Sequence, residues 1–375
     1  MFDSLLSSFL KKSDDEPFIA VDIGTSAIKI LSVMPTGDRF ARQGYKLVGV
    51  GVAPTPAGAV NNNAVVKPEA VGKAIRTLID ANDIKGERTT FAVPAPAVFT
   101  KRITIGYCEP KDLEKNITFE AGNYIPHTIE AVHLDYQIVK VHGTSSMDVL
   151  LVAVKNEIID SYAAALQQAD LIPAIADVDS FALENMFEIS YPEERAKTVA
   201  LLNIGSRYTN VSILQDGQSL FAGDVGVGGR LYTDALCEAL HMTPAEAEKI
   251  KAGETPSGYD ESVVAETFDR TTEHIAAELQ RQIGFFWNAA ATDRSIEGIY
   301  VCGGAAQIPG LVEEIGVKTG MICVAVEPFR WIEWNSQFDE DLIKEVMCSM
   351  GVSVGLAIRR FGDKKQAQAR IGVNG

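Results

Sequence analysis

The sequence predicts an α/β protein of two related domains, with a smaller α+β unit inserted into the first. Three observations support this class. The 375 residues correspond to about two domains of ~150 residues each, a strand–turn–strand pattern occurs near the start of both halves, and a run of alternating apolar and polar residues interrupts the first half. The hydrophobic content of 46% and the charged content of 22% are typical of a globular protein with a large core.

The first domain is expected to span residues 18–196. It begins with short apolar strands, and a helix then starts at Pro68, a residue favoured at the first helical position. Residues 1–17 form an amphipathic segment and a polar linker, and the amphipathic segment either docks on a partner or membrane surface or packs on its own domain. The expected strands of this domain lie at 18–23, 27–34, 45–52, 89–93 and 174–178.

Residues 98–173 are expected to form the inserted subdomain. Between Val132 and Ile138, apolar residues alternate strictly with other residues, which is the pattern of a strand in a sheet with one solvated face. A buried strand resumes at 174–178, so the chain is expected to return to the first domain there.

The second domain is expected to span residues 197–375. It opens with three strands, continues with a helical subdomain at about 230–297, and ends with a helix at about 342–360 that returns to the first domain. The expected strands of this domain lie at 198–204, 209–215, 219–224 and 298–302.

Charge and cysteine usage exclude several classes of function. Fifty acidic residues against 34 basic residues give a net charge of −16, so the average surface repels nucleic acid and anionic lipid. The five cysteines include no CxxC pair, which argues against a disulfide framework or a zinc site. The sequence shows neither a signal peptide nor an apolar run of about 18–20 residues, so a cytoplasmic protein is expected.

A glycine turn with neighbouring hydroxyl groups occurs twice between apolar strands. The first copy is Asp22-Ile23-Gly24-Thr25-Ser26, and the second is Asn203-Ile204-Gly205-Ser206. Glycine lets successive backbone N–H groups approach phosphate oxygens, and short hydroxyl side chains add donors. Either turn alone also fits an ordinary β-hairpin, but two matching copies that face each other favour a clamp on a triphosphate.

Two side chains of the first copy suit a phosphate site. Asp22 could hold Mg²⁺ through water, because Mg²⁺ in proteins binds one or two carboxylates together with phosphates and keeps several waters. Lys29 is a charged residue within an apolar strand and could reach a phosphate as a point charge.

Two glycine pairs add to this pattern. Gly303-Gly304-Ala305 follows a buried strand and precedes a helix, and the missing Cβ atoms would let a flat ring such as adenine lie on the backbone. A simple glycine-rich strand-to-helix turn is the alternative. Gly228-Gly229 heads another helix, whose N-terminus favours an anion.

Together these motifs resemble the phosphate 1, phosphate 2 and adenosine motifs of the actin, Hsp70 and sugar-kinase superfamily over about residues 18–360. Within that superfamily the chain most resembles the PilM family of type IV pilus assembly, with the FtsA division proteins as relatives. The resemblance implies a two-domain actin-like fold, which is a duplicated ribonuclease H-like fold, and an inserted subdomain similar to the 1C subdomain of these two families. It also implies ATP or ADP with Mg²⁺ as ligands.

The resemblance assigns further residues to the site. Ala247-Glu248-Lys249-Ile250-Lys251 matches a helix that implies Glu248 on the ribose and Lys251 beside adenine. Asp179 matches the acid that opens the connecting helix and that helps to organise water or metal in hydrolysing relatives. The implied metal-binding residues are therefore Asp22 and Asp179.

One departure from the superfamily pattern affects catalysis. Asn203 stands where active relatives carry an Asp, and a neutral amide is neither an anionic Mg²⁺ ligand nor a proton acceptor. Asp179 is also one methylene shorter than a Glu. We therefore expect a nucleotide-binding scaffold that is at most a slow ATPase, with a small-molecule kinase or an FtsA-like polymerising ATPase as the alternatives.

The resemblance also implies partners and location. A PilM binds the short cytoplasmic N-terminus of a PilN-like inner-membrane protein, in a groove between the core of its first domain and the inserted subdomain, and other pilus platform or motor proteins are possible partners. The segment 364–370 has no apolar face like the one that tethers FtsA to membrane. We expect a cytoplasmic protein at the periphery of the inner membrane, whose contact with the membrane is indirect.

Overall fold

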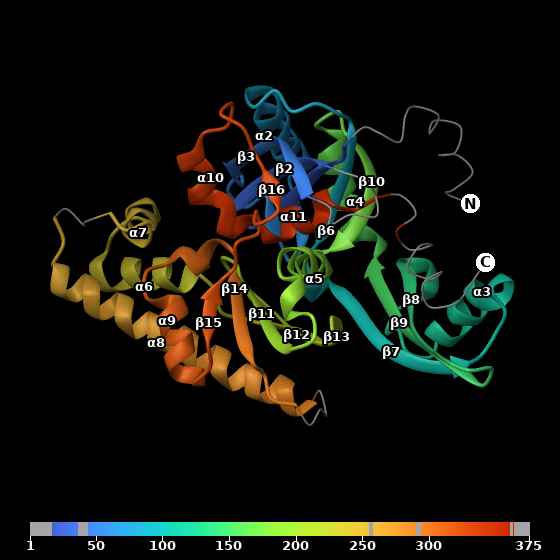
Figure 1. Cartoon of the computed structure of the whole chain (residues 1–375). Helices are drawn as coiled ribbons and strands as arrows, with labels where there is room; N and C mark the ends of the chain where they lie inside the picture. Colours follow the sequence, from blue (N-terminus) through green and yellow to red (C-terminus); the bar gives the residue numbers. More distant parts are fainter. Residues whose placement is uncertain (1–16, 37–43, 255–257, 290–293, 361–362, 364–375) are drawn as a thin grey trace.

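The protein is represented by a computed structural model that describes residues 17–36, 44–254, 258–289, 294–360 and 363. The amphipathic segment predicted within residues 2–10 lies outside them. Two sheets with their helices form two lobes, and a smaller sheet extends from the first lobe (Figure 1).

The first sheet is mixed, and helices cover both of its faces. Its described strands run in the order β10-β6-β1-β2-β3-β16; β1, β6 and β10 are parallel, while β1, β2 and β3 are antiparallel neighbours. In β1, Ile19 and Val21 share a core with α2 and α4, whereas Ala20 shares one with α5 and α11, because successive side chains of a strand face opposite sides. The elements are β1 (Ile19–Ile23), β2 (Ala27–Thr36), β3 (Gly44–Pro54), β4 (Val60–Asn61), β5 (Ala64–Val65), α2 (Pro68–Ala81), β6 (Arg88–Val93), α4 (Asn156–Gln167), β10 (Ile172–Val178), α5 (Asp179–Ser190), η3 (Pro192–Glu194) and β16 (Ile332–Glu333).

The second sheet repeats this plan. Its described strands run in the order β13-β12-β11-β14-β15, and β11 pairs with β12 antiparallel and with β14 parallel, as β1 does with β2 and β6. The helices α6, α8 and α9 cover its outer face. The elements are β11 (Thr198–Ile204), β12 (Thr209–Gln215), β13 (Gln218–Val225), α6 (Arg230–Leu240), α7 (Pro244–Lys251), α8 (Glu261–Ala289), β14 (Gly298–Cys302), η4 (Gly304–Gln307), α9 (Leu311–Thr319) and β15 (Cys323–Ala325).

The inserted unit has a sheet and a core of its own. Its described strands run in the order β7-β9-β8, and α3 contributes Leu113 and Ile117 to their shared core. Helix α4, which the sequence analysis included in the insertion at 98–173, instead packs on α2 in the core of the first lobe. We therefore propose that the inserted unit ends at Lys155, the last residue of β9. The elements are η1 (Ala95–Ala97), β7 (Val98–Gly106), α3 (Pro110–Ala121), η2 (Ile129–Ala131), β8 (Val132–His142) and β9 (Ser146–Lys155).

The C-terminal helices return to the first lobe. Helix α11 contacts β1, β2, β6 and α5, so it lies with α5 in the middle of the molecule (Figure 1). Thr90 in β6 donates a hydrogen bond from Oγ1 to the Leu356 carbonyl over 3.0 Å. None of the helices in the described ranges is long and apolar enough to cross a membrane. The elements are α10 (Glu340–Val346), η5 (Met347–Met350) and α11 (Gly351–Ala357).

Candidate functional site

The two glycine turns have the same local geometry. Gly24 N–H donates to the Ala27 carbonyl over 3.0 Å, and Gly205 N–H donates to the Tyr208 carbonyl over the same distance. A Cβ atom on either glycine would lie 3.0 Å from that same oxygen, which is tighter than ordinary contacts. Both turns therefore favour glycine for the same reason, and the duplication predicted from the sequence extends to the hydrogen bonds.

The first turn carries an internal ion pair. Asp22 and Lys29 are cross-strand partners on β1 and β2, and Lys29 Nζ lies 2.9 Å from Asp22 Oδ2. Their side chains are only 14% and 16% exposed. Thr55 fixes the turn from the end of β3, since its hydroxyl donates to the Gly24 carbonyl over 2.7 Å. The charge of Lys29 is therefore compensated by Asp22 within the turn.

The second turn has a neutral pair at the equivalent positions. Asn203 and Asn210 are cross-strand partners on β11 and β12, and Asn203 Nδ2 donates to Asn210 Oδ1 over 3.1 Å. Asn210 in turn donates to Asp224 Oδ1 on β13 over 2.6 Å. Burial raises the pKa of Asp224, while the Asn210 hydrogen bond lowers it. The sequence analysis did not identify Asn210 or Asp224.

Glycines hold the second turn against its neighbours. A Cβ on Gly228 would lie 2.6 Å from the carbonyl oxygens of both Gly205 and Ser206, and Gly229 N–H donates to the Gly205 carbonyl over 2.9 Å. Gly303 has a φ of +96°, and its Cβ would lie 2.5 Å from the Ile204 carbonyl oxygen. One glycine of each pair, Gly228 and Gly303, therefore approaches the turn so closely that a side chain would displace the backbone.

The residues assigned to adenosine lie together beside Gly229. The Cβ position of Gly229 is 3.1 Å from Ala305 Cβ and 3.7 Å from Lys251 Nζ. Lys251 pairs with Glu248 over 2.8 Å, and Thr233 donates to Glu248 over 2.6 Å. The structure thus brings Lys251, at the end of helix α7, and Ala305 to Gly229, and the neighbouring Gly304 is exposed with no atom near its Cβ position.

Asp179 begins α5 and joins the two lobes. Its Oδ1 accepts hydrogen bonds from the backbone N–H groups of Ala95 at 2.9 Å and Ser180 at 2.7 Å, and its Oδ2 accepts one from the Tyr208 hydroxyl at 3.1 Å. The residue is 7% exposed. Burial raises the pKa of Asp179 to about 7; nearby Asp224 and Asp22 add to the rise, while the Ala95 and Tyr208 donors oppose it. Asp179 is thus held in part as a neutral carboxyl group.

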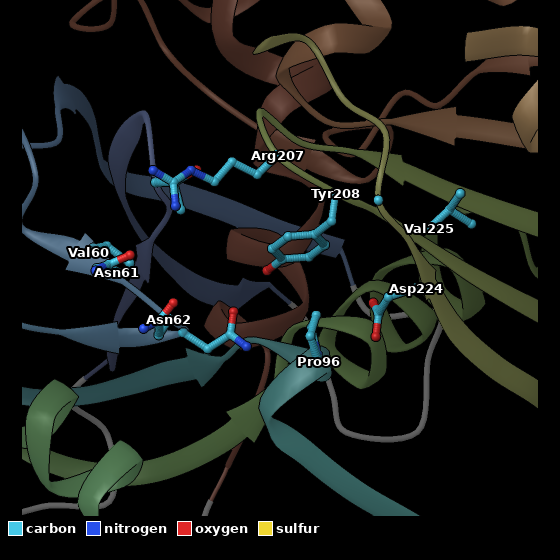
Figure 2. Close-up of a pocket in the computed structure, with 11 residues that line it drawn as sticks. Val60, Asn61, Asn62, Pro96, Arg207, Tyr208, Asp224 and Val225 are labelled. Carbon is cyan, nitrogen blue, oxygen red and sulfur yellow. The ribbon is translucent and has the colours of Figure 1, made fainter. Parts of the chain in front are cut away.

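A cavity of about 360 Å³ lies between the lobes next to these turns. Figure 2 shows Arg207, Tyr208 and Asp224 of the second lobe on one side, and Val60, Asn61 and Asn62 of the first lobe opposite. A smaller cavity of about 40 Å³ adjoins it, and both are lined by Thr25 and Tyr208. The smaller cavity is also lined by Asp22, Gly24 and Asp179.

Both residues that the resemblance implies for Mg²⁺ already have partners. Asp22 pairs with Lys29, and Asp179 accepts the three hydrogen bonds described above. Across the described part of the chain, no group of three His, Cys, Asp or Glu side chains could hold a metal ion. The residues present fit a Mg²⁺ ion only if phosphate oxygens and water supply most of its ligands.

Comparisons with known proteins agree on a family. The model of the type IV pilus assembly protein PilM family matches residues 20–361. The cell division protein FtsA of Staphylococcus epidermidis is 22% identical over 346 residues, which cover 80% of this chain and 72% of FtsA. A chain of a PilM–PilN type IV pilus biogenesis complex superposes with a TM-score of 0.79 at 24% identity, covering 92% of this chain and 98% of that one.

A second solved structure shares the fold at greater distance. The ethanolamine utilization protein EutJ from Carboxydothermus hydrogenoformans superposes with a TM-score of 0.53 at 14% identity, covering 92% of this chain and 89% of EutJ. These likenesses confirm the predicted two-domain actin-like fold. Because the family model spans most of the sequence, the chain belongs to the family of the type IV pilus assembly protein PilM.

Proposed function

We propose that this chain is a nucleotide-binding scaffold of the type IV pilus assembly platform, located at the cytoplasmic side of the inner membrane. Family membership supports the scaffold role over a small-molecule kinase or a polymerising ATPase. The observation that carries nucleotide binding is the pair of glycine turns with identical hydrogen bonds, one in each lobe, beside an interlobe cavity. A triphosphate held by both turns would join the lobes.

The bound nucleotide would be ATP or ADP. Thr25 and Ser26 offer backbone and hydroxyl donors from one lobe, and Ser206 offers them from the other. Gly24 and Gly205 shape the two turns, and their own N–H groups are used inside them. Gly304, whose Cβ position is open, would provide backbone surface for the adenosine part, with Gly229, Ala305, Glu248 and Lys251 nearby. Gly228 and Gly303 would support this part of the site by letting the second turn approach closely. Bound Mg²⁺ would neutralise phosphate charge, and Asp22 and Asp179 would be the carboxyl groups that hold its waters.

The second turn supports binding without rapid hydrolysis. Asn203 and Asn210 form a neutral amide pair where the first turn has the Asp22–Lys29 ion pair. An amide cannot take up a proton from an attacking water at neutral pH. We therefore infer that ATP acts as a structural or switching ligand that joins the two lobes.

The first experiment measures nucleotide retention and phosphate release with Mg·ATP for the native chain, Asn203→Asp and Asn335→Asp. The last variant adds the same charge at an exposed loop residue and serves as the control. We expect retention without turnover in the native chain and control, and faster phosphate release in Asn203→Asp. Rapid release by the native chain would contradict the scaffold assignment.

The proposed partner is the cytoplasmic N-terminal peptide of a PilN-like inner-membrane protein. The similarity to a chain of a PilM–PilN complex supports this partner. The proposed groove would lie between the first lobe and the inserted unit, which has a core of its own. Contact with the membrane would then pass through the partner. Titration of a labelled peptide should increase its fluorescence anisotropy, and a shuffled peptide should not; equal responses would reject the specific contact.

A further inference from the structure

Arg207 is a cavity-lining cation that the site described above does not use. It follows Gly205 and Ser206 in the second glycine turn. Its side chain extends from the second lobe into the interlobe cavity, toward the side where Val60 and Asn61 lie (Figure 2). Thr25 of the first turn lines the same cavity. Arg207 of the second turn and Thr25 of the first turn therefore line one cavity, so a phosphate held there would be within the same enclosure as the guanidinium group.

Other cations near the site are already neutralised by carboxylates. Lys29 pairs with Asp22 over 2.9 Å, Lys251 with Glu248 over 2.8 Å, and Arg230 with Asp234 over 3.2 Å. Arg207, in contrast, is exposed and makes no ion pair or side-chain hydrogen bond with the other described residues. Its positive charge remains available to an anion, and a guanidinium keeps that charge at any physiological pH.

The position of Arg207 indicates which part of a bound nucleotide it can reach, the adenosine or the terminal phosphate. Lys251, Gly229 and Ala305 mark the adenosine end, and none of these three lines the cavity at Arg207. A nucleotide that runs from the adenosine end past the glycine turns would bring its outermost phosphate to this cavity. A diphosphate, one group shorter, would leave the guanidinium without a partner.

We propose that Arg207 binds the terminal phosphate of a nucleoside triphosphate and makes the site prefer ATP to ADP. This inference rests on the proposed nucleotide binding and adds the residue that determines which nucleotide state is recognised. A guanidinium can bind two phosphate oxygens through parallel N–H groups, whereas a lysine offers a single point charge.

The test compares the dissociation constants of Mg·ATP and Mg·ADP by isothermal titration calorimetry at fixed ionic strength. The proteins are the native chain, Arg207→Ala, Arg207→Lys, and Arg230→Ala as a control that removes a paired arginine nearby. A hydrogen bond to a charged group predicts that Arg207→Ala weakens ATP binding about 10- to 100-fold and ADP binding by less than about twofold. Arg207→Lys should fall between, and Arg230→Ala should bind both nucleotides like the native chain.

The outcomes distinguish the role of Arg207 from nucleotide binding itself. Equal losses for ATP and ADP, or no loss for either, would overturn the role of Arg207 while leaving nucleotide binding intact. A native chain that binds neither nucleotide would reject the proposed function and this inference together. Arg207 is exposed, so we expect its replacement to leave the fold intact. Retained ADP affinity shows that each variant is folded. If the alanine variant is unstable, Arg207→Lys still tests the role of the guanidinium group, because it keeps the charge.

Discussion

Asp179 provides a test of the electrostatics at the interlobe contact. Its pKa rises from 3.8 to about 7 mainly through burial. Because the folded pKa lies above the unfolded one, this carboxyl group lowers stability progressively as pH rises from about 4 to 7, and its cost is greatest once it ionises in the folded state. A shift of about three pKa units corresponds to about 4 kcal/mol at most. Asp179→Asn removes this cost because an amide does not ionise. Its oxygen can still accept the hydrogen bonds from the Ala95 and Ser180 N–H groups.

We therefore expect Asp179→Asn to be more stable than the native chain at pH 8.5, by up to about 4 kcal/mol, with the difference shrinking as the pH falls toward 4. Urea unfolding followed by far-UV circular dichroism at pH 8.5, 6.5 and 5 measures it. Asp160→Asn, on the exposed side of α4, removes a carboxylate in solvent and is the matched control. A variant less stable than the native chain at pH 8.5, or a difference independent of pH, would refute the reasoning.

Three further substitutions test the packing of the same region. A Cβ on Gly355 would lie 1.7 Å from a backbone oxygen of α5, so Gly355→Ala should cost about 3 kcal/mol or more and lower the urea midpoint; an unchanged midpoint would exclude this contact. Gly228→Ala should displace the Gly205 turn and weaken ATP binding at least about tenfold in calorimetry, in contrast to Gly106→Ala in the inserted unit, where the Cβ position is open. Tyr208→Phe removes a donor to Asp179, so the fall in stability that begins near pH 4 should continue to a higher pH in the same urea series. An unchanged or lower end of this fall would show that the hydroxyl does not stabilise the carboxylate.

Local sequence signals predicted much of the fold. The five strands expected for the first sheet agree with observed strands to within two residues at each end, because apolar runs bounded by turn residues are a local property. The glycine turns were also visible locally, since each needs a residue without a Cβ at a fixed place between two strands. The sequence analysis includes helix α4 in the insertion, whereas its apolar residues pack with α2 in the core of the first lobe; an apolar helix face does not by itself show which neighbour it covers.

The part of the site that the sequence analysis missed depends on long-range pairing. Asp224 reaches Asn210 through the register of β12 and β13, and Tyr208 reaches Asp179 only because α5 packs beside the second lobe. Asn210, Tyr208 and Asp224 belong to none of the motifs that the sequence analysis identified. The free charge of Arg207 could not be predicted either, because it depends on which carboxylates the other cations find in the folded chain.

The two turns differ in their side-chain pairs, and neither pair carries a net charge. One additional cation can therefore determine whether the site prefers ATP or ADP. In the first turn, Asp22 and Lys29 cancel each other's charge, and in the second, Asn203 and Asn210 carry none. The turns therefore supply backbone and hydroxyl donors that do not distinguish two phosphates from three. Asp179 and Asp224 add acidic groups nearby, which oppose additional phosphate charge unless they are protonated or screened by a cation. An unpaired guanidinium at the terminal position changes that balance for the triphosphate alone, so discrimination between ATP and ADP does not require the chain to hydrolyse either.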